Sequence, residues 1–277
     1  MNMDQMTLWT IAQRELREAL RNKWLWFYSV GLAGLALGLS RVGLASAGYA
    51  GLGGFGRTAA SLINALLLFV PLIGLTVGAN AVAADRERGA LMYLLAQPVN
   101  RPEVFFGKVL GAMLAVIAAL GLGFGLAGLG LASAGDADVT IYLTLAGFVF
   151  LLALACLGIG FLISTLTRKA STAAGAALLL WLGLVFFADL GLMGATIAFK
   201  PTAGTVLWYL LANPLQTFKL GAMFGLHATL DILGPVGQYA AYHFGDHLPW
   251  LLTALLLAWS VSTFGAAFFI FNRRGDV

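Results

Sequence analysis

Six long apolar stretches constrain the fold of this chain more than any other feature of its sequence. A helix needs roughly 20 apolar residues to cross the hydrocarbon core of a bilayer. Of the 277 residues, 60% are hydrophobic and only 10% are charged, which is not the composition of a protein that folds in water. The sequence therefore predicts an all-α polytopic membrane protein with six transmembrane helices. We place these helices at about 24–44, 59–83, 109–133, 141–166, 172–197 and 249–271.

Residues 1–23 are predicted to form an amphipathic helix that lies along the membrane surface. Leu8, Ala12 and Leu16 recur at helical spacing, and charged residues occupy the opposite face. The charges from Arg14 onward interrupt any apolar core of a signal peptide, so we expect this segment to stay on the mature protein.

The distribution of basic residues predicts the orientation. Twelve of the 16 Lys and Arg residues lie in the N-terminal segment, the 85–108 loop, the link at Arg168-Lys169 and the C-terminal tail. The other loops hold the remaining four basic residues and most of the loop aspartates. Because cytoplasmic loops carry the excess of Lys and Arg, both termini are predicted on the cytoplasmic side of a bacterial inner membrane.

The segment at 198–248 is predicted to be an outer hairpin and loop between the fifth and sixth spans. Residues 203–226 are apolar enough for a seventh span, but a seventh span would place the C-terminal arginines outside. We expect instead a re-entrant or interfacial helical hairpin that is broken at Asn213-Pro214. Such a break is tolerated at membrane depth where protein or water satisfies the backbone.

The cytoplasmic loop at 85–108 is predicted to contain a short amphipathic helix. Leu91, Leu94 and Leu95 share one face of this helix, and Gln97-Pro98 ends it. A short helix held below the membrane is suited to docking in a groove of a cytoplasmic partner. A solvated interfacial loop is the alternative, and the residues alone leave both interpretations open.

Acidic residues are predicted to begin two helices in this loop. Asp85 and Glu87 are expected in the first turn of the short helix, where the helix dipole favours anions. Pro102 and Glu103 are typical of the first turn of the next helix.

This loop resembles the coupling-helix region of ABC-2 type transporter permeases. The resemblance rests on Glu87-Arg-Gly-Ala-Leu-x-x-Leu-Leu-Ala-x-Pro98, followed by Asn100-Arg101 and Gly107-Lys108. It extends along nearly the whole chain, which implies a single transmembrane domain over 1–277. More narrowly, the run from Asp85 to Gly89 and the His-containing outer loop resemble the permeases that serve copper-site maturation of nitrous oxide reductase in denitrification.

The resemblance implies that ATP hydrolysis belongs to another subunit. The chain has no G-x-x-x-x-G-K-[ST] motif, so it lacks the phosphate-binding loop of a P-loop ATPase. We expect a non-catalytic permease that binds no cofactor, in a homodimer with a cytoplasmic ATPase that holds ATP and Mg. The implied ATPase-coupling residues are Asp85, Arg86, Glu87, Arg88, Gly89, Leu91, Met92, Leu94, Leu95 and Pro98.

The outer loop carries candidates for partner docking and for metal binding. By resemblance, a periplasmic subunit is expected to dock on this side, with aromatic candidates Trp208, Tyr209 and Phe218 that alternatively sit at the lipid interface. If their segments are helical, two pairs of possible copper ligands each share a face. These are Met223 with His227 and His243 with His247. Hydrogen-bonded surface residues are the stronger alternative.

Three intramembrane features remain open. Asp189 is a candidate for a proton relay or for a structural, partly hydrated carboxylate. The Gly121-xxx-Gly125 spacing allows close helix packing, either within the subunit or in a dimer. Cys156 has no partner for an intrachain disulfide and is interpreted as an apolar filler.

The functional hypotheses differ in where the driving force comes from. The first is an ABC permease that carries out transport or mechanical work at the outer face. Within this first hypothesis, an exporter of a lipid, a drug or a polysaccharide is the alternative. The second hypothesis is an ion-coupled transporter that uses Asp189, and it is weakened because other intramembrane acidic residues are lacking. A membrane enzyme is not favoured, since no nucleophile, base or metal cluster gathers on one face.

Overall fold

The described part of the chain is a bundle of α-helices. The computed structural model describes residues 5–23, 25–34, 38, 52–133, 139–187, 190, 191, 194, 201–225 and 234–273. No β-strand occurs within these ranges. The prediction of an all-α fold is therefore confirmed.

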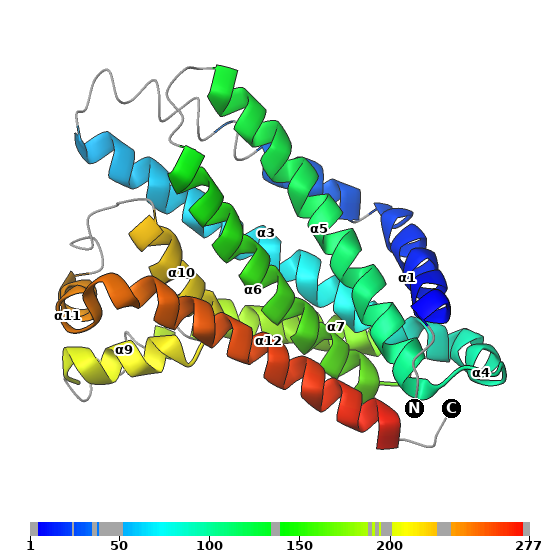
Figure 1. Ribbon diagram of the computed structural model, residues 1–277. Helices are drawn as coiled ribbons and strands as arrows, with labels where there is room; N and C mark the ends of the chain where they lie inside the picture. Colours follow the sequence, from blue (N-terminus) through cyan, green and yellow to red (C-terminus); the bar gives the residue numbers. More distant parts are fainter. Residues whose placement is uncertain are drawn as a thin grey trace.

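The helices follow the chain in the order drawn in Figure 1. The N-terminal half contains α1 (Gln5–Leu20), the helix Leu25–Gly34, α3 (Leu52–Glu87), α4 (Ala90–Leu95) and α5 (Arg101–Ser133). The C-terminal half contains α6 (Val139–Leu166), α7 (Ala170–Leu182) with the π-helical turn η1 (Gly183–Phe187), α9 (Ala203–Leu211), α10 (Pro214–Gly225), α11 (Gly234–Phe244), the 3-10 turn η3 (Gly245–His247) and α12 (Leu248–Arg273).

Four helices among the described residues are long and apolar enough to cross a membrane. Their apolar segments lie in α3, α5, α6 and α12. The predicted stretches at 24–44 and 172–197 correspond to the shorter apolar helices Leu25–Gly34 and Ala170–Phe186. A polytopic membrane protein is supported, and the count of six spans stays a prediction.

Two of the long helices differ from their predicted limits. α6 and α12 match the predicted stretches within two residues, whereas α3 runs from Leu52 to Glu87 and α5 already begins at Arg101. The end of α3 and the start of α5 lie at one end of the bundle. Figure 1 shows the start of α1, the end of α12 and α4 at this same end, and α9, α10 and α11 at the other. The loop predicted at 85–108 is thus mostly helical.

Glycines bring α3 and α6 into close contact in the centre of the bundle. A Cβ atom at Gly74 would lie 2.6 Å from the Ala153 carbonyl oxygen, and one at Gly160 would lie 2.7 Å from that of Leu75. Such contacts between backbones stabilise helix pairs in membranes. A Cβ at Gly121 or Gly125 would meet no described atom within 4 Å, so the described part of the subunit does not pack on this pair.

The predicted break at Asn213-Pro214 is confirmed. α9 ends at Leu211 and α10 begins at Pro214. Asn213 lies between them, where its Oδ1 accepts a hydrogen bond from the Leu215 amide (2.9 Å) and its Nδ2 donates to the Leu184 carbonyl (2.8 Å). The side chain thereby caps the first turn of α10, whose amides a helix start leaves open, and joins the break to η1.

Candidate functional site

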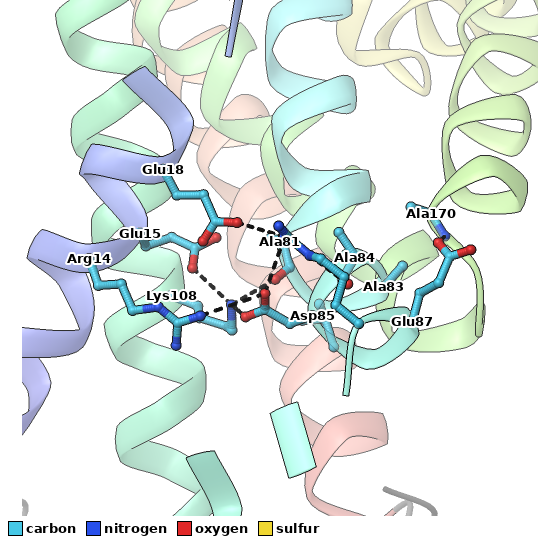
Figure 2. Close-up of polar contacts among 12 residues, drawn as sticks. Arg14, Glu15, Glu18, Ala81, Ala83, Ala84, Asp85, Glu87, Lys108 and Ala170 are labelled. Carbon is cyan, nitrogen blue, oxygen red and sulfur yellow. Dashed lines mark hydrogen bonds and ion pairs between the residues drawn. The ribbon is translucent and has the colours of Figure 1, made fainter. Parts of the chain in front are cut away.

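A buried lysine joins three helices near α4. Lys108 of α5 is 1% exposed, and its ammonium group donates to Glu15 Oε2 of α1 (2.8 Å), Asp85 Oδ2 of α3 (2.5 Å) and the Ala81 carbonyl oxygen of α3 (2.8 Å). Figure 2 shows these groups converging between the helices. An ammonium group has three donors, so the arrangement uses its full capacity.

Burial makes this cluster sensitive to the loss of any member. Removing a charge from water is costly unless an opposite charge and hydrogen bonds compensate for it. Two carboxylates share Lys108, and the guanidinium groups of Arg88 (3.4 Å) and Arg14 (4.0 Å) approach the second oxygen of Asp85. Burial raises the pKa of Glu15 above its ordinary value, and Lys108 opposes this effect.

Glycines let α1 pack against the first turns of α5. A Cβ at Gly107 would lie 2.8 Å from the Ile11 side chain, and one at Gly111 would lie 2.5 Å from the Ala12 carbonyl oxygen. α1 is helical as predicted, and Glu15 lies in its contact with α5. The predicted place of α1 at the membrane surface stays a prediction.

The prediction that Asp85 and Glu87 begin the short helix is wrong. Both residues, with Arg86, lie in the last turn of α3, where their side chains contact α5, α7 and the α6–α7 link. Arg86 Nη1 donates to the Thr167 carbonyl oxygen (2.6 Å), and Glu87 Oε2 accepts from the Ala170 amide (2.8 Å). Glu87 therefore serves the N-terminus of α7, where an anion is favourable.

The chain turns from α3 into α4 at Gly89. The φ angle of Gly89 is 72°, a left-handed conformation that glycine adopts without steric cost. Arg88, just before this turn, donates to Glu18 Oε1 of α1 at 2.6 Å. The α3–α4 corner is therefore joined to α1 by an exposed ion pair as well as by the buried cluster.

Of the predicted coupling residues on α4, Met92 is exposed, whereas the leucines are partly or fully buried. Leu91 is only 2% exposed, and Leu95 packs against the same apolar core. Met92 and Tyr93, at 58% and 74% exposure, form the outward face. The leucine spacing correctly indicated a buried face, but this face packs against the chain's own core. Met92 and Tyr93 are the side chains that stay accessible to a partner. Tyr93 was not among the predicted coupling residues.

The turn after α4 follows the prediction. α4 ends at Leu95, and Pro98 lies in an exposed turn before α5. Glu103 accepts from the Asn100 backbone amide (3.0 Å) and from its side-chain Nδ2 (3.1 Å), so it caps the start of α5. α4 is thus a short helix between the long helices α3 and α5 (Figure 1).

The aromatic candidates at the opposite end divide into two groups. Trp208 and Tyr209 of α9 are 58% and 50% exposed, and Trp208 makes an edge contact with Phe244. The docking prediction for Phe218 is wrong, because the ring is completely buried in the apolar core. Only the first two are accessible on the described surface.

His243 and His247 do not share one helix face, because no continuous helix joins them. α11 ends at Phe244, Gly245 has a φ angle of 47°, and His247 lies in the 3-10 turn. The His243 ring stacks on Tyr239 with centroids 5.1 Å apart. Among the described residues, no three His, Cys, Asp or Glu side chains form a group that could hold a metal ion.

The remaining candidates form no site within the described residues. Met223 is 7% exposed, and its proposed partner His227 lies outside the described residues. Asp189 lies outside them as well. Cys156 is fully buried among apolar side chains, as expected for a filler.

The described residues form an all-α bundle whose long apolar helices are consistent with a polytopic membrane protein. Residues 9–275 match the family described as ABC-2 family transporter protein, and the chain belongs to this family. It is therefore a membrane component of an ABC transporter.

Curated relatives allow a narrower comparison. The chain is 32% identical over 274 residues to the probable ABC transporter permease protein NosY of Stutzerimonas stutzeri, covering 96% of this chain and 98% of that protein. It is 33% identical over 277 residues to the protein of the same name from Pseudomonas aeruginosa, with the same coverage.

Proposed function

We propose that this chain is the permease subunit that couples ATP hydrolysis in a separate cytoplasmic ATPase to transport or mechanical work at the periplasmic face. The observation that carries the proposal is the exposed α4 on a corner fixed by Lys108, Asp85 and Glu15. A force applied to α4 acts on α3 and α5 directly, and on α1 through these ion pairs. Bistable packed elements transmit small displacements in this way.

The proposal includes the assembly and its orientation. Two permease chains form a homodimer in the inner membrane, with both termini cytoplasmic, and each receives a NosF-like ATPase that holds ATP and Mg. Met92 and Tyr93 form the contact with the ATPase, and the buried Leu91 and Asp85 hold α4 in place from behind.

The names of the curated relatives support a role in copper-site maturation of nitrous oxide reductase. In this role a NosD-like periplasmic subunit docks at the outer end, where Trp208 and Tyr209 are exposed. An exporter of a lipid, a drug or a polysaccharide would need the same ATPase but no such outer subunit.

Affinity purification of the tagged protein from mild detergent tests the coupling proposal. We expect a stoichiometric ATPase and ATP hydrolysis in the purified complex. An outer subunit in the same complex supports the maturation role, and its absence favours an exporter. A permease that purifies without any ATPase, under conditions that preserve a control ABC complex, contradicts the proposal.

The two outer histidines allow a test of direct copper handling. We expect the double variant His243→Ala/His247→Ala to leave the copper content of the co-produced reductase unchanged, because the two rings lie on different elements and His243 stacks on Tyr239. Metal analysis of the purified reductase gives the answer. Copper-deficient reductase with normal amounts of permease would restore the ligand hypothesis.

A further inference from the structure

A cleft rich in arginine lies between α1 and the end of α3. Its volume is about 530 Å³, and its charged lining is Arg14, Arg17, Arg21, Glu18 and Arg88, with a threonine and a glutamine beside them. Arg14 and Arg17 lie on α1, Arg21 directly follows its end, and Arg88 approaches from the α3–α4 corner. Positive charge thus converges on one opening from two separate elements.

The acidic groups near the cleft neutralise only part of its positive charge. Glu18 is bound to Arg88 at 2.6 Å, and Asp85 is held by Lys108, with Arg14 at 4.0 Å. Arg17 and Arg21 are exposed and have no acidic side chain within 4.0 Å among the described residues. Guanidinium groups bind phosphate oxygens through paired N–H donors. The cleft therefore has the chemistry of a phosphate site.

The surroundings of the cleft favour a phosphate carried by a lipid. The helix Leu25–Gly34 follows α1 directly and leaves Trp26, Phe27 and Val30 exposed, at 46%, 63% and 64%. α1 itself exposes Met6 and Trp9. Tryptophan beside arginine is typical of segments at the membrane interface. A headgroup in the cleft leaves apolar surface close by for the acyl chains.

We propose that this cleft binds the phosphate headgroup of an anionic phospholipid of the cytoplasmic leaflet. Arg17 and Arg21 supply the attraction, while Arg14 and Arg88 border the bound phosphate and also approach Asp85. A lipid bound there contacts α1 and the α3–α4 corner together. The lipid composition of the membrane then affects how firmly α1 is held against the α3–α4 corner. This effect does not depend on the partner that binds α4.

Native mass spectrometry of the delipidated full-length protein tests this site. Phosphatidylglycerol is titrated against wild type and against Arg17→Gln/Arg21→Gln. We expect the tightest lipid to bind about 25-fold more weakly to the variant, about fivefold for each arginine removed. Both side chains are exposed, so the melting temperature is expected to stay the same.

A second pair of cations provides the matched control. Arg168→Gln/Lys169→Gln removes two exposed charges from the α6–α7 link, which contacts the end of α3 but does not line the cleft. This pair is expected to leave the tight binding intact. Equal losses in the two double variants, or no loss in either, would overturn the proposal.

Further ligands separate the possible sources of the phosphate. Phosphatidylcholine carries the same phosphate without net charge and is expected to bind weakly, and inorganic phosphate is expected to bind weakly for lack of acyl chains. Inorganic phosphate that competes fully with the lipid would overturn the lipid assignment. Loss of the ATPase from the complex in Arg17→Gln/Arg21→Gln, with lipid binding unchanged, would make the cleft a protein-docking surface instead.

Discussion

Replacing Lys108 with Met is expected to destabilise the protein by about 3–5 kcal/mol, the usual cost of breaking a buried ion pair. The change leaves Asp85, which is 2% exposed, and Glu15 without their shared cation. Thermal unfolding of the purified protein in detergent measures the effect. Lys169→Met, which removes an exposed lysine nearby, is the matched control and is expected to change stability by less than about 0.5 kcal/mol.

The triple variant Lys108→Met/Asp85→Asn/Glu15→Gln separates charge from shape. It removes the lysine together with the two carboxylates that the single variant leaves uncompensated, so we expect it to recover most of the lost stability. If the charges keep the α3–α4 corner in place beside α1, the triple variant will fold and its complex will hydrolyse ATP. The hydrolysis will then do no work at the outer face. A single Lys108→Met variant that melts with wild type would contradict the role assigned to the cluster.

The apolar helices could be predicted from the sequence because each is specified by its own residues. α6 and α12 are continuous apolar runs with charged or turn residues at their ends, so length and composition suffice. The break at Asn213-Pro214 was also locally encoded, since proline and a capping asparagine act on their own neighbourhood.

The charge cluster could not be predicted because its partners are distant in sequence. Lys108 and Glu15 are 93 positions apart, and Glu87 finds its partner 83 positions later at Ala170. Helix dipole preferences indicate that an acidic residue favours some helix N-terminus. They do not say which helix, and for Glu87 it was α7 rather than the adjacent α4.

The choice of docking residues had the same limit at both ends of the bundle. Leu91 was chosen for its apolar spacing and Phe218 as an aromatic residue of the outer segment, and both are buried. Periodicity indicates that a face is buried but not what covers it. At these positions the cover is this chain. Of the aromatic and apolar docking candidates, Met92 stays exposed at one end, beside Tyr93, and Trp208 and Tyr209 stay exposed at the other.

The double substitution Met92→Ala/Tyr93→Asp is expected to weaken binding of the ATPase by at least about 30-fold, because a central aromatic contact contributes about 2 kcal/mol or more to an interface. Both side chains are exposed in this chain, so its own stability is expected to change by less than about 0.5 kcal/mol. Co-purification with the ATPase at graded concentrations measures the first effect, and the melting temperature of the permease alone measures the second.

Two variants determine whether the loss belongs to the exposed face of α4. Tyr242→Asp places the same charge on a 91% exposed tyrosine of α11 at the opposite end of the bundle, and we expect normal ATPase binding. Leu91→Asp places it on the buried face and is expected to lower the melting temperature, because the carboxylate has no partner in the apolar core. If Leu91→Asp abolished ATPase binding at unchanged stability while Met92→Ala/Tyr93→Asp had no effect, α4 would have to turn its leucine face outward in the complex, and the assignment of the docking face would be reversed.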